Sequence, residues 1–200
     1  MITPIIMESE LGEVKAKLEL LREQQIEQVH FDIGDGLFSE LLSITPADLG
    51  GADLGKMQID FHLLVDDPME WIRECATVKP KRIIGQIERM GEQMGFLAEI
   101  ENWGITGGLA LGIGTPVTEL EREVLDKCKV ILLMAVPVGT SGNKFDERVL
   151  PKIRELRRRY AGAVLVDGGI NKETYKLAVE AGASEAGANS AWWRGEWTRK

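Results

Sequence analysis

Two side chains that can do chemistry stand two residues apart in the stretch VHFDIGDG, residues 29–36. His30 and Asp32 would point to the same face of a β-strand, because side chains alternate along a strand. An imidazole and a carboxylate on one face suit metal binding or proton transfer. The alternative is a histidine satisfied within the core beside an aspartate that caps a helix. This stretch alone leaves both interpretations open.

The rest of the chain repeats a pattern of strand followed by helix, at the spacing that right-handed β-α-β units require. Eight strands and about seven helices predict an eight-fold (β/α)8 TIM barrel, with a doubly wound open sheet as the alternative. A chain of 200 residues is at the short end for such a barrel, so we expect one domain over residues 1–200. The predicted strands are residues 3–7, 28–34, 57–65, 81–89, 106–113, 130–136, 163–169 and 184–191.

Three of the segments between the strands carry specific expectations about helices. Residues 44–55 predict only a weak helix, broken by glycines. Residues 115–128 predict one helix with a proline in its first turn. Residues 143–160 predict a helix whose internal proline should kink or offset it.

A barrel would bring the reactive side chains to one place, since active sites of this fold lie at the C-terminal ends of the strands. His30 and Asp32 end the second predicted strand, His62 the third and Asp167 the seventh. The chain has only two histidines, and both fall at such positions. Each residue alone could be structural, but the four together predict a site for one divalent metal ion. Nitrogen and oxygen ligands favour Zn²⁺, Mn²⁺, Fe²⁺ or Co²⁺ over Mg²⁺ and Ca²⁺.

The loops after the last three predicted strands are rich in glycine: GTSG at 139–142, DGG at 167–169 and GANSA at 187–191. Simple turn punctuation explains most such clusters. Three adjacent loops beside a predicted metal site favour a phosphate site instead, because backbone N–H groups there can bind an anion. The candidate phosphate-binding residues are Gly139, Thr140, Ser141, Gly142, Gly168, Gly169, Asn189 and Ser190.

The composition argues against several classes of protein. The formal net charge is −8, and the one basic run, RELRRRY at 154–160, is typical of the solvated face of a helix, so we expect no nucleic-acid partner. Cys75 and Cys128 lie outside any CxxC motif, which argues against a disulfide framework and fits a cytoplasmic protein. The N-terminal MITPIIMESELG predicts neither a secretion signal nor a membrane span, and we expect no membrane partner.

Several segments in combination resemble the ribulose-phosphate 3-epimerase family, over about residues 2–193. HFDIGDG resembles the family's H-x-D-x-M-D-G, and DFHLLVDDP resembles its D-V-H-L-M-V. GLALGIGTP resembles G-x-A-L-N-P-x-T-P, and VILLMAVPVGTSGNKF resembles V-L-x-M-S-V-N-P-G-F-G-G-Q-x-F. VDGGINKET and the following AGA match the family closely. Hexulose-phosphate synthases and allulose-phosphate epimerases share parts of this pattern.

The resemblance implies an enzyme of the pentose phosphate pathway that interconverts D-ribulose 5-phosphate and D-xylulose 5-phosphate. It implies that His30, Asp32, His62 and Asp167 bind one divalent metal ion. It also implies that Asp32 and Asp167 exchange the proton at C3 through an enediolate. His62 and Met134 would line the substrate pocket, although Met134 could equally be barrel packing.

Two other functions stay open. One is the same scaffold acting on another sugar phosphate, as a hexulose-phosphate epimerase or an aldol-type lyase. The other is a non-catalytic barrel that binds a sugar phosphate. We expect a homo-oligomer, a dimer or larger, because clustered tryptophans near the C-terminus suit packing across the end of the barrel or a subunit contact.

The sequence departs from the family pattern around the predicted pocket, while the metal and acid/base set is intact. A family serine near the N-terminus is replaced by Ile5, and a strand-four histidine by Gln86. The last helix is shortened to WWRGEWTRK, residues 192–200. These departures predict fewer substrate contacts or an altered substrate preference. The other replaced or unfavourable positions are Gly34, Gly112, Ile113 and Asn189.

Overall fold

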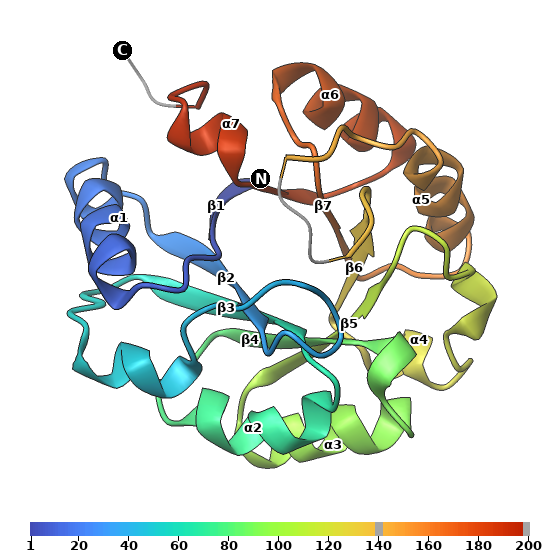
Figure 1. Cartoon of the computed structure of the whole chain (residues 1–200). Helices are drawn as coiled ribbons and strands as arrows, with labels where there is room; N and C mark the ends of the chain where they lie inside the picture. The colour runs from blue at the N-terminus through green and yellow to red at the C-terminus, as the bar shows by residue number, and fades with distance from the viewer. Residues whose placement is uncertain (139–141, 198–200) are drawn as a thin grey trace.

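The computed structural model describes residues 1–138 and 142–197. Eight parallel strands form a closed barrel in which each strand pairs with its neighbour in sequence and β1 pairs with β8 (Figure 1). The predicted (β/α)8 TIM barrel is confirmed, and the open-sheet alternative is wrong. The strands are β1 Ile2–Ile6, β2 Gln28–Gly34, β3 Gln58–Leu64, β4 Arg82–Gln86, β5 Thr106–Leu111, β6 Val130–Met134, β7 Ala163–Asp167 and β8 Glu185–Ala188.

Helices surround the barrel on its outside (Figure 1). The two described ranges contain seven α-helices and three 3₁₀ helices. The α-helices are α1 Leu11–Glu23, α2 Pro68–Ala76, α3 Gln93–Asn102, α4 Val124–Lys127, α5 Val149–Arg157, α6 Lys172–Ala181 and α7 Ser190–Trp193. The 3₁₀ helices are η1 Pro46–Gly51, η2 Ile87–Arg89 and η3 Val117–Glu119.

The single helix predicted over residues 115–128 is wrong. This segment forms η3 and the short α4, with extended backbone at Leu120 between them. Gln93 on α3 explains the break, because its amide donates to the Glu119 carbonyl at 2.7 Å and accepts from the Glu121 N–H at 3.1 Å. A side chain from a neighbouring helix therefore satisfies the backbone groups that a continuous helix would have used.

The helix predicted over residues 143–160 is shorter than expected. It begins at Val149, so Pro151 lies in its first turn. An N–H in the first turn has no partner within the helix, so proline is tolerated there and does not interrupt α5. The helix is thus shorter than predicted at both ends, and Pro151 is not an internal residue that could kink it.

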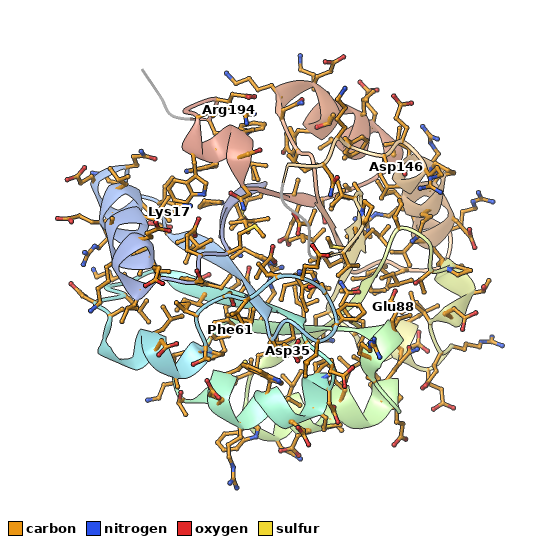
Figure 2. All side chains as sticks on the ribbon, in the orientation of Figure 1. Lys17, Asp35, Phe61, Glu88, Asp146 and Arg194 are labelled. Atoms are coloured by element: carbon orange, nitrogen blue, oxygen red, sulfur yellow. The ribbon has the colours of Figure 1, made fainter. Side chains whose placement is uncertain are left out.

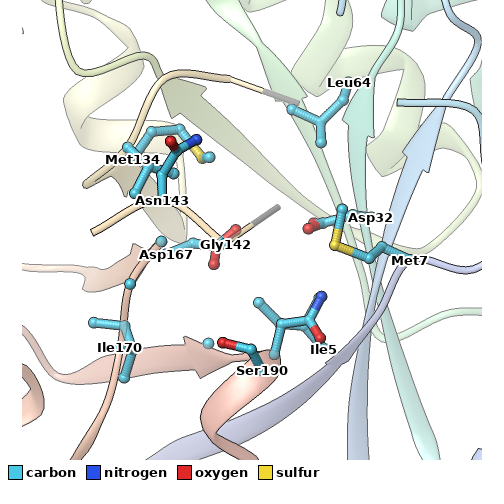
Figure 3. A pocket seen from close by; sticks show the side chains of 15 residues that line it. Ile5, Met7, Asp32, Leu64, Met134, Gly142, Asn143, Asp167, Ile170 and Ser190 are labelled. Carbon is cyan, nitrogen blue, oxygen red and sulfur yellow. The ribbon is translucent and has the colours of Figure 1, made fainter. Parts of the chain in front are cut away.

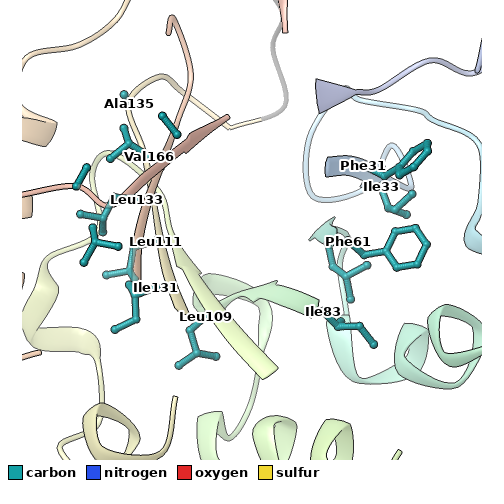
Figure 4. Packing of buried hydrophobic residues seen from close by; sticks show 14 of the residues in the cluster. Phe31, Ile33, Phe61, Ile83, Leu109, Leu111, Ile131, Leu133, Ala135 and Val166 are labelled. Atoms are coloured by element: carbon teal, nitrogen blue, oxygen red, sulfur yellow. The ribbon is translucent and has the colours of Figure 1, made fainter. Parts of the chain in front are cut away.

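Apolar side chains pack on both faces of the barrel wall. Strand β6 shows the alternation: Ile131 and Leu133 belong to the large core between barrel and helices, whereas Val130, Leu132 and Met134 belong to a smaller cluster. The smaller cluster draws on β4, β5, β6 and β7, as expected for the side chains that fill the interior of a barrel. Figure 4 shows part of the large core, with Phe31 and Phe61 on one side and Leu133 and Val166 on the other.

The other half of the wall, β1 to β4, places polar groups among the buried residues. Arg82 Nη2 lies 2.6 Å from Asp60 Oδ2 and 2.8 Å from Glu185 Oε2, and Gln28 also donates to Asp60. Asp60 and Arg82 are paired in the β3–β4 register, and Glu185 begins β8. This ionic cluster lies toward the N-terminal ends of the strands, the end of the fold that usually serves stability.

The shortened C-terminal helix is confirmed, since α7 has four residues. Tryptophans fill the space beside it. Trp193 Nε1 donates to the Ile5 carbonyl of β1 at 2.8 Å, and Lys17 Nζ lies 4.5 Å from the centre of the Trp193 ring. Lys17 is on α1, as Figure 2 shows. Trp197 packs edge-on against Tyr175 of α6. Aromatic side chains therefore connect the C-terminal segment to α1, β1 and α6.

Candidate active site at the mouth of the barrel

Strands β2 and β3 bring three of the predicted metal ligands together. Phe31 and Ile33 on β2 pack in the core outside the barrel. Side chains alternate along a strand, so His30 and Asp32 face the barrel interior. The β2–β3 register places Asp32 directly opposite His62. Asp167 ends β7 on the other side of the barrel.

His30, Asp32 and His62 form a group that could hold a metal ion, with one potential ligand atom from each residue and all three within 4.8 Å of one another. His62 Nδ1 lies 2.9 Å from Asp32 Oδ1, and His30 Nε2 lies 3.3 Å from the same oxygen. Asp167, the fourth predicted ligand, is not a member of this group. The three buried residues therefore form a compact cluster, and Asp167 is more distant from it.

The donor set fits a divalent transition metal. Two imidazoles and a carboxylate offer the mixed nitrogen and oxygen ligands that Zn²⁺, Mn²⁺, Fe²⁺ and Co²⁺ accept. Neither ring nitrogen of His30 has a hydrogen-bond partner among the described residues, although the side chain is fully buried. A buried polar atom without a partner is costly and calls for an explanation, which an ion at this position supplies.

The surroundings shift the pKa values of Asp32 and Asp167 in opposite directions. Burial opposes the charged form of Asp32, but its contacts with His30 and His62 outweigh burial and hold the Asp32 pKa well below its usual range. Burial and the nearby Asp32 carboxylate raise the pKa of Asp167 to about 8. The two carboxyl groups thus differ in charge state near neutral pH when no cation is present.

The two imidazoles also respond differently to burial. Burial lowers the pKa of His62 despite its contact with Asp32, so this ring is neutral near pH 7. At His30 burial acts in the same direction, but the carboxylates of Asp32, Asp167 and Asp60 outweigh it and raise the pKa. The carboxylates that favour a proton on His30 would equally favour a metal cation bound to it.

A pocket opens above this cluster at the C-terminal ends of the strands (Figure 3). In Figure 3, Asp32 and Asp167 lie on opposite sides of the pocket. His30 and His62 are fully buried and do not line it. Among the predicted residues, those that line the pocket are Asp32, Met134, Gly142, Asp167, Gly168, Gly169, Asn189 and Ser190. The predicted residues Gly139, Thr140 and Ser141 lie outside the described residues.

The two glycines that follow β7 are required by the space around them. Gly168 and Gly169 adopt φ values of 106° and 65°, which favour glycine. A Cβ on Gly169 would lie 2.3 Å from the backbone nitrogen of Phe145, and one on Gly168 would lie 2.5 Å from the Val136 side chain. These glycines let the loop after β7 pack closely against the segment that follows β6.

Two departures from the family pattern have visible structural counterparts. At Gly34, a Cβ would lie 2.4 Å from the Leu41 carbonyl oxygen, so the loop after β2 folds back onto the space that a side chain would need. That loop is held by Asp35, which accepts from the Asp66 N–H at 2.8 Å. Ile5 packs against Gly187 and lines the pocket, which makes this part of the wall apolar.

A third departure, Gln86, lies beside the cluster. It is fully buried at the end of β4, and its Nε2 lies 2.9 Å from His62 Nε2. Gly112 is a fourth departure from the family pattern. Its backbone N–H donates to Glu88 at 2.7 Å, and its carbonyl accepts from Lys152 at 2.6 Å. Side chains from η2 and α5 thus hold the backbone of the loop after β5.

Sequence reasoning missed several residues of the pocket wall. Met7 follows β1, Leu64 ends β3 and Asn143 follows the loop after β6. Met7 and Leu64 are apolar residues at strand ends, where a core position and a pocket position look alike in sequence. Only the rule that the C-terminal end of every strand faces the site could have suggested them.

No helix within residues 1–138 and 142–197 is long and apolar enough to cross a membrane.

Comparisons with known proteins place the chain in a family. Residues 1–193 match the model of the ribulose-phosphate 3 epimerase family. The ribulose-phosphate 3-epimerase of Bacillus subtilis (strain 168) is 29% identical over 197 residues, which cover 95% of this chain and 90% of that protein. The enzyme of the same name from Synechocystis sp. is 29% identical over 198 residues, covering 95% of this chain and 86% of that protein.

A solved structure of N-acetylmannosamine-6-phosphate 2-epimerase from Clostridium perfringens is similar in fold. Its TM-score is 0.66, and the match covers 95% of this chain and 86% of that one. At 12% sequence identity it supports the barrel fold alone.

Proposed function

The chain belongs to the ribulose-phosphate 3-epimerase family and is an epimerase, and we propose that it interconverts D-ribulose 5-phosphate and D-xylulose 5-phosphate with one divalent metal ion bound. The proposed reaction inverts C3, the carbon next to the ketone, by removing its proton and returning one to the opposite face through an enediolate. The observation that carries the proposal is the pair of carboxyl groups, Asp32 and Asp167, on opposite sides of one pocket (Figure 3).

The position of the two aspartates suits proton transfer on both faces of a flat intermediate. A bound enediolate between them would expose one face of C3 to Asp32 and the other to Asp167. In either direction of the reaction, the carboxylate form of one residue removes the proton and the acid form of the other delivers one. The two residues are only 6% and 5% exposed, which limits competing exchange with water.

His30, Asp32 and His62 would hold the metal, with Asp167 as the fourth ligand. The compact group of three and the unpartnered nitrogens of His30 support the first three ligands. Asp167 is supported by its place on the pocket wall and by the family pattern that it matches. When bound, a divalent cation supplies Lewis-acid stabilisation of the negative charge on the substrate oxygens.

The phosphate of the substrate would lie at the glycine-rich side of the pocket. Gly142, Gly168, Gly169, Asn189 and Ser190 line this side, and backbone N–H groups in such loops bind anions. We extend the phosphate site to Gly139, Thr140 and Ser141 on sequence grounds. Met134 would pack against the sugar, and His62 would act on the substrate only through the metal.

The test is proton NMR of ribulose 5-phosphate in D₂O with metal-loaded protein. We expect deuterium at C3, xylulose 5-phosphate as the product, and loss of both in Asp32→Asn and Asp167→Asn. The exposed Asp126→Asn is a matched control that should retain activity. Because both catalytic variants also alter proposed ligands, their Co²⁺ affinity must be measured alongside.

Each other outcome has a definite meaning. Exchange only with a six-carbon ketose phosphate would replace the pentose substrate with that of the alternative enzyme. Binding of ribulose 5-phosphate without exchange at C3 would establish a non-catalytic barrel. Loss of activity in a variant that still binds Co²⁺ with unchanged affinity would assign that aspartate to proton transfer.

A further inference from the structure

Gln86 occupies a buried position next to the proposed metal ligands and has no role in the reaction described above. Its Nε2 lies 2.9 Å from His62 Nε2, while the other ring nitrogen, His62 Nδ1, lies 2.9 Å from Asp32 Oδ1. Gln86 Oε1 has no hydrogen-bond partner among the described residues. A buried amide with one satisfied end and one unsatisfied end needs a physical explanation.

These contacts place the single proton of a neutral His62. An amide nitrogen only donates, so His62 Nε2 must accept from Gln86. The ring proton then lies on Nδ1, which donates it to Asp32. In this state His62 offers no lone pair toward the cluster that it forms with His30 and Asp32.

Metal binding through Nδ1 requires the opposite tautomer. A nitrogen that binds a metal carries no proton, so the proton must move to Nε2, which faces Gln86. Two donors would then meet. A half-turn of the amide exchanges its nitrogen and oxygen, which are nearly the same size, and lets Oε1 accept from Nε2–H. A histidine that binds a metal usually donates its other N–H to an oxygen in this way.

We infer that Gln86 is a positioning residue for His62, whose amide donates to the imidazole when no metal is bound and accepts from it when a metal is bound. This inference rests on the proposed metal site, and it concerns metal binding rather than the epimerisation step. The inference explains why Gln86 Oε1 has no partner here: it would accept from His62 only when a metal is bound. It also accounts for the departure from the family's histidine at this position, since an amide and an imidazole can both donate or accept.

The first test reads the tautomer directly. The chain contains two histidines, so ¹⁵N-histidine labelling gives two imidazole signals, and His30→Asn assigns the remaining one to His62 in the metal-free protein. We expect the proton of His62 on Nδ1 without metal and on Nε2 with Zn²⁺, which is diamagnetic. A proton on the same nitrogen in both states would overturn the inference.

The second test measures Co²⁺ affinity by competition with a chelator. Gln86→Met keeps the length of the side chain but can neither donate to His62 nor accept from it. We expect about 10–100-fold weaker Co²⁺ binding, as is usual when a hydrogen-bond partner of a metal-binding histidine is lost. Gln86→His should bind Co²⁺ nearly as tightly as the unaltered chain. Gln93→Met removes another buried amide, on α3, and should leave Co²⁺ affinity unchanged.

The outcomes separate this inference from the proposed function. Unchanged Co²⁺ affinity in Gln86→Met would overturn the role of Gln86 and leave the metal site standing. Failure of the unaltered chain to bind either Co²⁺ or Zn²⁺ would overturn the metal site and this inference together. If Gln86→Met does not fold, as judged by circular dichroism, weak binding by Gln86→His or an unchanging tautomer would still overturn it.

Discussion

Individual residues in this site take their properties from neighbours that lie far away in sequence. Asp32 and Asp167 are the same amino acid, yet contact with two imidazoles lowers the pKa of Asp32 and burial raises that of Asp167 to about 8. Divergent carboxyl groups of this kind are typical of acid/base pairs. The sequence places both residues at strand ends, but it contains no information on which one accepts hydrogen bonds.

The raised pKa of Asp167 predicts a pH-dependent stability of the metal-free protein. The carboxyl group ionises near its ordinary pKa of 3.8 in the unfolded chain and near 8 in the folded chain. Between these values the unfolded chain has released the proton and the folded chain retains it, so this group lowers the free energy of unfolding as pH rises from about 4 to about 8. The loss approaches about 1.4 kcal/mol per pH unit at most.

Asp167→Asn removes this ionisation, so its stability relative to the unaltered chain should increase as pH rises over the same range. Urea denaturation in the presence of a chelator, at several pH values, measures the difference. Asp126→Asn, at an exposed position of α4, is the matched control for the substitution itself. A pH-independent difference for Asp167→Asn would mean that Asp167 is already ionised in the folded protein near pH 4.

Secondary-structure elements were predicted well where the signal is local. All eight strands lie within or close to their predicted ranges. The signal is clearest at β6, whose continuous apolar run is typical of a buried parallel strand. The predicted helices at 115–128 and 143–160 differ from the structure for different reasons. Gln93 breaks the first from a distance, which no local pattern reveals, whereas Pro151 marks the actual first turn of the second.

The sequence predicted which residues lie at the candidate site, but not the distances between them. The four reactive residues were found because the fold rule assigns function to strand ends. The compactness of His30, Asp32 and His62, and the greater distance of Asp167, depend on the β2–β3 register and on barrel closure, which the sequence does not specify. The orientation of the Gln86 amide toward His62 is likewise a property of packing.

At the level of elements, α7 stabilises the barrel through Trp193 rather than through its length. Trp193→Phe keeps much of the ring contact but removes the hydrogen bond to the Ile5 carbonyl, so we expect a loss of about 1 kcal/mol in the free energy of unfolding. Trp193→Ala, which also removes the half-buried ring, should cost more than Trp193→Phe. Chemical denaturation measures both losses.

Trp103 on the outside of the barrel provides the control for this prediction. This residue is 46% exposed, and its Nε1 donates to Glu99 at 3.1 Å in contact with solvent. Trp103→Phe should therefore change stability by less than Trp193→Phe. Equal effects of the two substitutions would show that the contact between α7 and β1 contributes no more than an exposed hydrogen bond.

The whole molecule separates two polar clusters along the barrel axis. The cluster at the mouth combines His30, Asp32 and His62, which could hold a metal ion, below the pocket that Asp32 lines. The cluster toward the other end pairs Arg82 with two carboxylates from β3 and β8. It joins strands on both sides of the β1–β8 closure, where the sequence separation is greatest.

The position of Arg82 leads to a prediction about stability without activity. Arg82→Met leaves Asp60 and Glu185 without their cation, and removing one partner of a buried ion pair typically costs about 3–5 kcal/mol. We expect a loss of that size in urea denaturation, with kcat unchanged where the variant is still folded, because Arg82 begins β4 and does not line the pocket that Asp32 and Asp167 line.

Replacing the partners as well distinguishes an unpaired charge from a general packing defect. In the triple variant Arg82→Met, Asp60→Leu and Glu185→Leu, no carboxylate stays buried without a cation, so much of the lost stability should return. If the triple variant is less stable than Arg82→Met alone, the carboxylates contribute through other contacts, such as that of Asp60 with Gln28. If kcat falls in Arg82→Met at temperatures where the protein is folded, the two ends of the barrel are coupled, and the separation of stability from function along the axis is wrong.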